Sequence, residues 1–169
     1  MFRHGRDFSC SIVSRSLVYS AISNLNFAHM LLVSQNIASE MIAVDGSHNG
    51  WRHLVLPIAN TDELVMDAVL TVSLFHAPQM SSNKGMQNAY YGRVIQGLQT
   101  RSQLQNCDQL SQHSILLTIL LLLTVIMVNG STDFPILFRM LQSAIDAIGG
   151  DKAFGSGCTA EFLVRQIQK

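Results

Sequence analysis

The sequence contains little charge, and the charges that it has cancel. Charged residues make up 13% of the 169 residues, with 11 basic and 11 acidic side chains, and this is about half the share in a typical domain. A neutral chain lacks the basic footprint of most nucleic-acid-binding domains. Apolar residues make up 48%, so we expect one helix-rich domain with a real core and a surface that suits a partner.

Cysteine is also scarce, and no metal motif is present. Cys10, Cys107 and Cys158 are odd in number and far apart, so neither a disulfide framework nor a CxxC pair is expected, and a reducing compartment fits best. The six histidines include His48 and His53 but form no HExxH motif and no cluster at ligand spacing. We expect surface or capping histidines, no metal site and no cofactor.

Catalytic motifs are missing as well. Gly155-Ser156-Gly157 matches neither a nucleophile elbow nor a phosphate loop, and we interpret it as linker. Asp62, Glu63 and Asp67 could pair as acid and base, but they are more typical of a solvated helix start. We therefore predict that the chain is not an enzyme and has no catalytic or DNA-contacting residues. A helical enzyme with dispersed catalytic groups stays open as an alternative.

The sequence does contain helical periodicity. Apolar residues recur at spacings of three and four, and no segment shows sustained strand alternation. The expected fold class is all-α, an irregular bundle of five to six helices joined by short loops. The main helices are predicted at residues 15–44, 63–77, 88–104, 108–129 and 132–148, with a short apolar turn of helix at 51–56 and a short last helix at 160–166.

Three regions follow from this pattern. Residues 1–14 lack periodicity and are predicted to be a poorly ordered N-terminus. Residues 15–150 are predicted to form the helical domain, and residues 151–169 a Gly-rich linker with a short C-terminal helix.

Local signals predict where several helices begin and end. Pro57 disfavours helix at Leu56 and is expected to kink or end it. Asn60 or Thr61 is expected to cap the following helix, and Gly130 to stop the long apolar one. For the next helix, the buried face is predicted to consist of Phe134, Leu137, Phe138, Leu141, Ile145 and Ile148.

The longest apolar run extends from Ile115 to Val128. A membrane-spanning helix needs about 20 apolar residues, and shorter runs are more often buried core. Polar residues close both sides of this run, and Thr118 and Thr124 lie inside it. We therefore predict a core helix. A small membrane-associated helical protein that uses Ile115–Val128 is the alternative function.

A series of segments over residues 51–150 has a characteristic order. The segments are Trp51, Leu54-Val55-Leu56-Pro57, Asp62 to His76, Ala89-Tyr90-Tyr91-Gly92-Arg93, Asp108, Ile115–Val128, Met140-Leu141-Gln142-Ser143-Ala144 and Gly149-Gly150. Their order resembles the fungal-specific transcription factor domain, the helical regulatory region of fungal binuclear zinc-cluster regulators. Met140 and Ser143 stand where the family tends to have histidine and glycine.

This resemblance implies transcription regulation in the nucleus through a protein partner or a small-molecule effector, with a homodimer as a further option. The scattered cysteines cannot supply the cysteine set of the family's zinc cluster, so the chain is interpreted as a fragment or a member without that cluster. DNA is then reached only through a zinc-cluster domain outside this sequence. Trp51, Tyr90, Tyr91 and Phe138 are predicted to be packing residues, and no effector contacts can be nominated.

Overall fold

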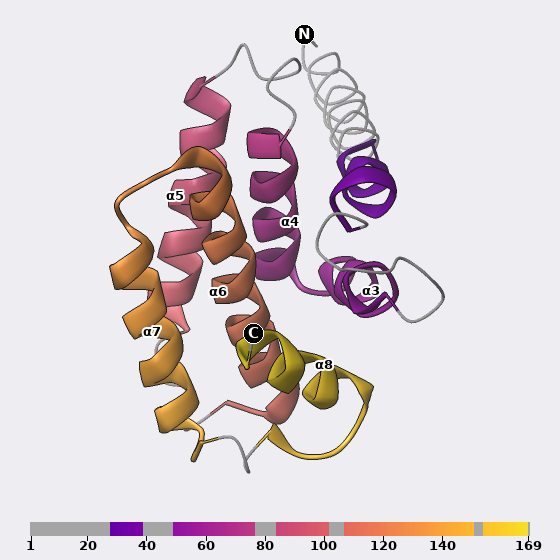
Figure 1. Ribbon diagram of the computed structural model, residues 1–169, viewed down its shortest axis with the longest axis vertical. Helices are drawn as coiled ribbons and strands as arrows, with labels where there is room; N and C mark the ends of the chain where they lie inside the picture. The colour runs from indigo at the N-terminus through magenta and orange to yellow at the C-terminus, as the bar shows by residue number, and fades with distance from the viewer. Residues whose placement is uncertain (1–27, 39–48, 77–83, 102–106, 151–153, 169) are drawn as a thin grey trace, which may run out of the picture.

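The computed structural model describes residues 28–38, 49–76, 84–101, 107–150 and 154–168, and every regular element in these ranges is a helix (Figure 1). The all-α class is confirmed. Because η2 and α3 are continuous, the described ranges hold seven helical segments, slightly more than the five to six predicted. The π-helices are η1 (Val33–Ile37) and η2 (Trp51–Val55), and the α-helices are α3 (Leu56–Ala59), α4 (Glu63–His76), α5 (Lys84–Thr100), α6 (Gln109–Asn129), α7 (Phe134–Ala147) and α8 (Cys158–Ile167).

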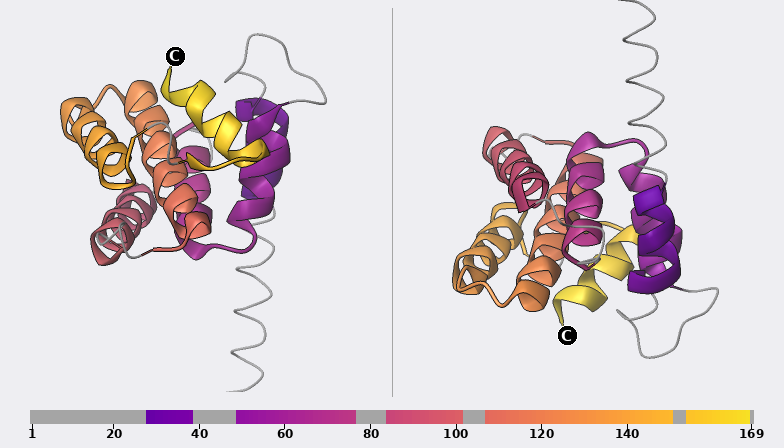
Figure 2. Two further views of the ribbon diagram at one scale, coloured as in Figure 1. Left: turned by 90° about the horizontal axis from the view of Figure 1, so that it is seen from below. Right: turned by 90° about the horizontal axis from the view of Figure 1, so that it is seen from above.

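Helix α6 is the centre of the bundle, with α4, α7 and α8 packed around it (Figures 1 and 2). It is long and apolar enough to cross a membrane by length and composition, but every residue from 113 to 126 is buried inside the protein. The predicted core helix is therefore confirmed, although Met127 and Val128 at its end are exposed. Gly130 ends the helix in the left-handed conformation, with φ of 67°, as predicted.

The helix does not end at Leu56, so the prediction that Pro57 ends it is wrong. η2 runs directly into α3, and Leu56 has helical angles of −66° and −41°. Pro57 is the second residue of α3, just after the π-helical turn of η2, and the helix continues through it although proline has no backbone N–H to donate. The cap of α4 also differs from the prediction, because Asp62 Oδ1 accepts the Leu64 N–H at 2.9 Å.

Helix α5 begins at Lys84 and not at Asn88. Residues 84–87, predicted to be loop before the helix at 88–104, are therefore helical, and that prediction is wrong. Gln87 Nε2 donates to the Leu74 carbonyl at 2.9 Å and ties this first turn to α4. The polar sequence of this turn is typical of a loop, but its contact with α4 favours the helix.

The buried face of α7 is narrower than predicted. Leu137, Leu141 and Ala144 are buried at helical spacing, whereas Phe134 and Phe138 are each 43% exposed. Their rings stack on each other, with centroids 5.9 Å apart. Phe138 comes directly after the buried Leu137 and therefore points away from the buried face, and Phe134 lies before the first buried residue of the helix. The prediction that these two rings pack in the core is wrong.

Several predictions concern residues outside the described ranges. These are the N-terminus at 1–14, most of the helix predicted at 15–44, and part of the linker predicted to begin at 151. Residues 28–38 are helical, as predicted. The predicted division of the chain into three regions stays a prediction. α8 itself packs into the same core as α6, through Ala160, Phe162 and Leu163.

Candidate functional site

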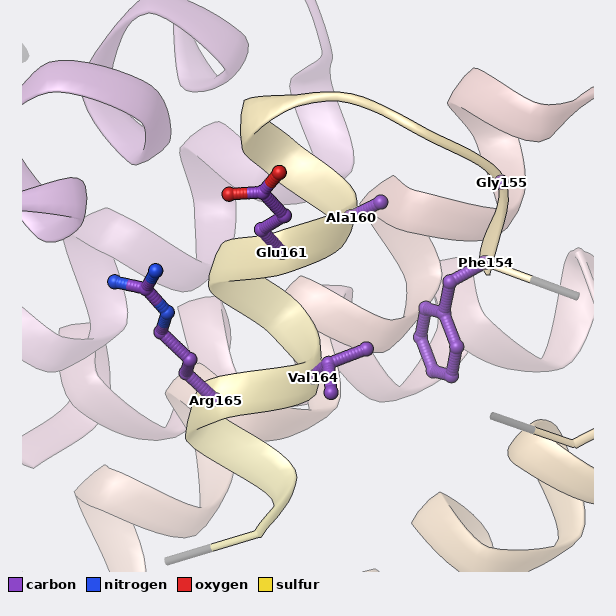
Figure 3. Close-up of a pocket in the computed structure, with 6 residues that line it drawn as sticks. All are labelled: Phe154, Gly155, Ala160, Glu161, Val164 and Arg165. Atoms are coloured by element: carbon purple, nitrogen blue, oxygen red, sulfur yellow. The ribbon is translucent and has the colours of Figure 1, made fainter. Parts of the chain in front are cut away.

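A shallow pocket of about 260 Å³ lies between α8 and the segment that precedes it. Figure 3 shows Ala160 and Val164 on the side of α8 that is nearer to Phe154, while Glu161 and Arg165 extend from the other side. The space between helix and segment is therefore apolar, with charges at its edge. The lining residues are Phe154, Gly155, Ala160, Glu161, Val164 and Arg165.

The segment before α8 is fixed at one backbone carbonyl. The Phe154 oxygen accepts hydrogen bonds from Gln109 Nε2 at 2.7 Å and His113 Nε2 at 3.0 Å. Both donors come from the first turns of α6, and the Phe154 side chain is itself buried. The described part of the segment interpreted as linker is thus bound to the core, although Gly155, Ser156 and Gly157 are exposed.

An aromatic pair joins α8 to η2. The rings of Trp51 and Phe162 meet edge to face, with centroids 5.2 Å apart and planes at 86°, a preferred geometry for aromatic pairs. Gly50 makes this approach possible, because a Cβ there would overlap the Phe162 ring. Trp51 is 5% exposed, and no atom of the described residues accepts a hydrogen bond from its indole N–H.

A second buried histidine forms a pair that sequence reasoning missed. His29 Nδ1 lies 2.6 Å from Ser73 Oγ and joins residues 28–38 to α4. Burial lowers the pKa of His29 and favours the neutral ring. A serine beside a histidine can act as a nucleophile with its base. Here a substrate has no access to the pair, because His29 is 4% exposed and Ser73 0%. We therefore interpret the hydrogen bond as a structural contact between helices.

The histidine prediction is therefore wrong for His29 and His113, which are buried and hydrogen-bonded, whereas His53 is exposed. Their partners are distant in sequence, and no local pattern signals them. Among the described residues, no group of three or more histidine, cysteine or acidic side chains gathers in a way that could hold a metal ion. Cys10 and His48 lie outside these ranges.

The three acidic residues near the start of α4 have different surroundings. Glu63 is exposed, as expected for a solvated helix start, but Asp62 and Asp67 are partly buried. Asp62 pairs with Arg101 at 2.8 Å, and Asp67 pairs with Arg93 at 3.0 Å. Both ion pairs join α4 to α5, and neither carboxylate faces the pocket beside α8.

The pKa values of the two aspartates shift in opposite directions, although burial acts on both carboxyls in the same way. Burial disfavours ionisation of Asp62, but hydrogen bonds from Arg101 and Ser114 outweigh it and hold the pKa of that carboxyl below its usual range. Burial raises the pKa of Asp67, and the neighbouring Arg93 only partly offsets this. These shifts arise in structural ion pairs, so they do not identify an acid and base pair.

The predicted packing residues differ in their surroundings. Trp51 is buried, and Tyr91 is half-buried with a pKa raised by burial and by Asp133. Tyr90 is half-buried beneath the Arg93 guanidinium, 5.2 Å from its ring centroid. Phe138 stacks on Phe134 and is exposed at the surface.

The chain matches the model of a known protein family. The model of the fungal specific transcription factor domain matches residues 34–168. The match extends beyond the resemblance noted at 51–150 and includes α8 and the pocket beside it. No curated protein and no solved structure matches the chain.

Proposed function

Because the chain belongs to the fungal specific transcription factor domain family, we propose that it regulates transcription through contacts with another protein and without contacting DNA itself. The family match over residues 34–168 is the observation that carries this proposal. The family is one of regulatory domains, which supports a non-enzymatic role in the nucleus.

The exposed apolar side chains support a protein partner. Met127 and Val128 at the end of α6 are exposed, as are Phe134, Ile136 and Phe138 on α7. These side chains come from the end of α6 and from α7, which a short turn joins, and a contiguous exposed apolar patch is typical of a protein-interaction site. The pocket beside α8, at about 260 Å³, is smaller than the roughly 300–1,000 Å³ of typical small-molecule sites. A protein partner therefore fits better than a small-molecule effector.

A tethered reporter assay tests the proposal. The full chain is fused to an unrelated DNA-binding domain, and transcription is measured from a promoter that carries the matching site. We expect a change in transcription relative to the DNA-binding domain alone. A V69D variant is the control, because Val69 is fully buried and a charge there unfolds the domain. Equal transcription with the chain, the control and the DNA-binding domain alone would contradict the proposal.

Two further measurements address its finer parts. A fluorescent fusion of the full chain should accumulate in the nucleus, and exclusion from it would count against the proposed location. The purified chain should not bind random-sequence duplex DNA, because its net charge is zero and non-specific binding comes from basic side chains on phosphates. Binding that weakens steeply with added salt would show that the chain itself contacts DNA.

A further inference from the structure

Helix α7 lies at the outer edge of the bundle, where it packs against α6 (Figures 1 and 2). Leu137, Leu141 and Ala144 form its buried face, and its other sides carry exposed or half-buried side chains. Among these are Phe134 and Phe138, each 43% exposed, whose rings stack on each other. An aromatic ring that is partly in water gains favourable free energy when a partner covers it. The outward side of α7 therefore favours association.

The outward side of α7 contains a pattern that repeats after two turns. An apolar residue is followed by a cation at one end, and seven positions later an apolar residue is followed by an anion. Residues that are three, four or seven positions apart lie on one side of a helix. All of these residues are exposed except Ile145, which is half-buried. We call the surface formed by Phe138, Arg139, Gln142, Ile145 and Asp146 the α7 face.

The two charges of the α7 face take part in no ion pair within the described part of the chain. The ion pairs found there join α4 to α5, and Arg139 donates its Nε–H to the Pro135 carbonyl at 3.2 Å. Arg139 and Asp146 do not pair with each other, because seven residues of helix separate them by about 10 Å along the axis. Both charges are therefore available to a partner.

The α7 face is complementary to itself when two copies are antiparallel. A two-fold axis that passes near Gln142 places residue 139 of each copy opposite residue 146 of the other, and residue 138 opposite residue 145. Each charge then faces an opposite charge, and each phenylalanine faces an isoleucine. A parallel pair would instead bring Arg139 beside Arg139 of the other copy. Charges beside an apolar seam select the orientation of paired helices in this way, and the chain's net charge of zero adds no repulsion between copies.

From these observations we propose that two copies of the chain associate through the α7 face in an antiparallel pair, with Arg139 of each copy beside Asp146 of the other. The inference rests on the proposed function and deepens it, because it names a second copy of the chain as a protein that covers the exposed apolar residues of α7. A helix of 14 residues is about 21 Å long. One pair of such helices buries less than the roughly 800 Å² per partner of a standard interface, so the expected dissociation constant is of micromolar order.

Sedimentation equilibrium of the full chain, at concentrations from about 1 to 200 μM, tests the proposal. The unmodified chain should pass from monomer to dimer over this range. The R139D chain and the D146R chain should each dimerise about tenfold more weakly, because each change places like charges opposite each other twice. A monomer at every concentration of the unmodified chain overturns the proposal, and so does an R139D chain that dimerises as tightly as the unmodified one.

An equal mixture of the R139D and D146R chains is the matched control. One chain then carries only acidic charges on the α7 face and the other only basic ones, so a mixed pair restores both attractive contacts. We expect the mixture to dimerise within about threefold of the unmodified affinity. A mixture that stays monomeric overturns the proposal, because the charges would then not face each other. Sedimentation needs no promoter and the reporter assay needs no dimer, so the two ideas fail separately.

Discussion

Helices α5 and α8 both cover the central helices, but they are held in different ways. α5 is joined to α4 by the ion pairs Arg93–Asp67 and Arg101–Asp62 and by the bond from Gln87 to the Leu74 carbonyl. α8 is held by buried rings and aliphatic groups. Directional polar bonds fix the register of two helices, whereas apolar packing alone accepts substitutes. The comparison therefore separates a fixed body, α4 to α6, from α8, which is held by apolar side chains.

The largest effect is expected inside the fixed body. Leu122 on α6 is fully buried, and Leu122→Ala removes packing and leaves a cavity. We expect a loss of roughly 3 kcal/mol in the free energy of unfolding, measured by urea denaturation. Trp51 is the single tryptophan and contacts Phe162 of α8, so its fluorescence reports on the contact between η2 and α8, while circular dichroism reports on all helices. The two transitions should shift together, and a shift in only one would show that α6 does not support both regions.

A change at the contact between η2 and α8 should instead separate the two signals. Gly50→Ala places a methyl group where the Phe162 ring lies, and we expect a loss of about 1–3 kcal/mol from overpacking. Because the clash falls on Phe162, which contacts Trp51, we expect it to weaken the packing of α8 first, so that the Trp51 fluorescence changes at lower urea than the circular dichroism.

The matched control for this change is Gly92→Ala on α5. A Cβ at Gly92 meets no other atom within 4 Å, so the substitution should stabilise the helix by about 0.5–1 kcal/mol. Coincident transitions in the Gly50→Ala chain, or a loss of stability in the Gly92→Ala chain, would remove the contrast between the two helices.

The difference between the two regions also explains what the sequence could predict. α6 and its stop at Gly130 follow from an unbroken apolar run and one glycine, which are local signals. The sequence did not indicate the cap at Asp62. The N–H groups of Thr61 and Asp62 donate to the Ile58 carbonyl at the end of α3, so the next helix begins only after Asp62. That arrangement depends on α3 continuing past Pro57.

The candidate site was beyond sequence reasoning for a different reason. Trp51 was predicted to be a packing residue, but its partner Phe162 lies at the far end of the chain. Nothing in the spacing of either residue indicates that the two rings meet. The same holds for His29 and Ser73, whose contact joins helices separated by the η2–α3 segment. Periodicity shows which face of a helix is buried, but not which other helix covers it.

A third prediction concerns the joint between residues 28–38 and the fixed body. The pKa of His29 is lowered by burial from its ordinary value of 6.5, so the unfolded chain binds a proton more readily than the folded one. The contribution of neutral His29 to stability is therefore complete above pH 6.5 and is lost as the pH falls towards its folded pKa. Urea denaturation between pH 8 and pH 5, at about half-unit steps, measures this slope.

The control for the pH slope is a His29→Asn chain, which keeps a polar side chain near Ser73 but cannot titrate in this range. We expect the difference in unfolding free energy between the two chains to shrink as the pH is lowered. A difference that stays constant would show that His29 does not gain a proton on unfolding.

The smallest effects are expected at the two ion pairs of α5, and they can be ranked. Arg101 and Asp62 side chains are 35% and 18% exposed, whereas Arg93 is 58% exposed. Arg101→Met should lower the free energy of unfolding by about 0.5–1 kcal/mol, and Arg93→Met by roughly 0–0.5 kcal/mol, because exposed pairs are screened by water.

The pH dependence of these two variants sharpens the ranking. The pKa of Asp62 is held low in the folded chain, so its contribution is present above its ordinary value of 3.8 and is lost as the pH falls through the folded pKa. The loss caused by Arg101→Met should therefore disappear in acid. The pKa of Asp67 is raised, so its ionisation already opposes folding near neutral pH, and Arg93 only reduces that penalty. If Arg93→Met proved the more damaging change, the register of α5 would depend on the exposed Arg93–Asp67 pair at its middle and not on the Arg101–Asp62 pair at its end.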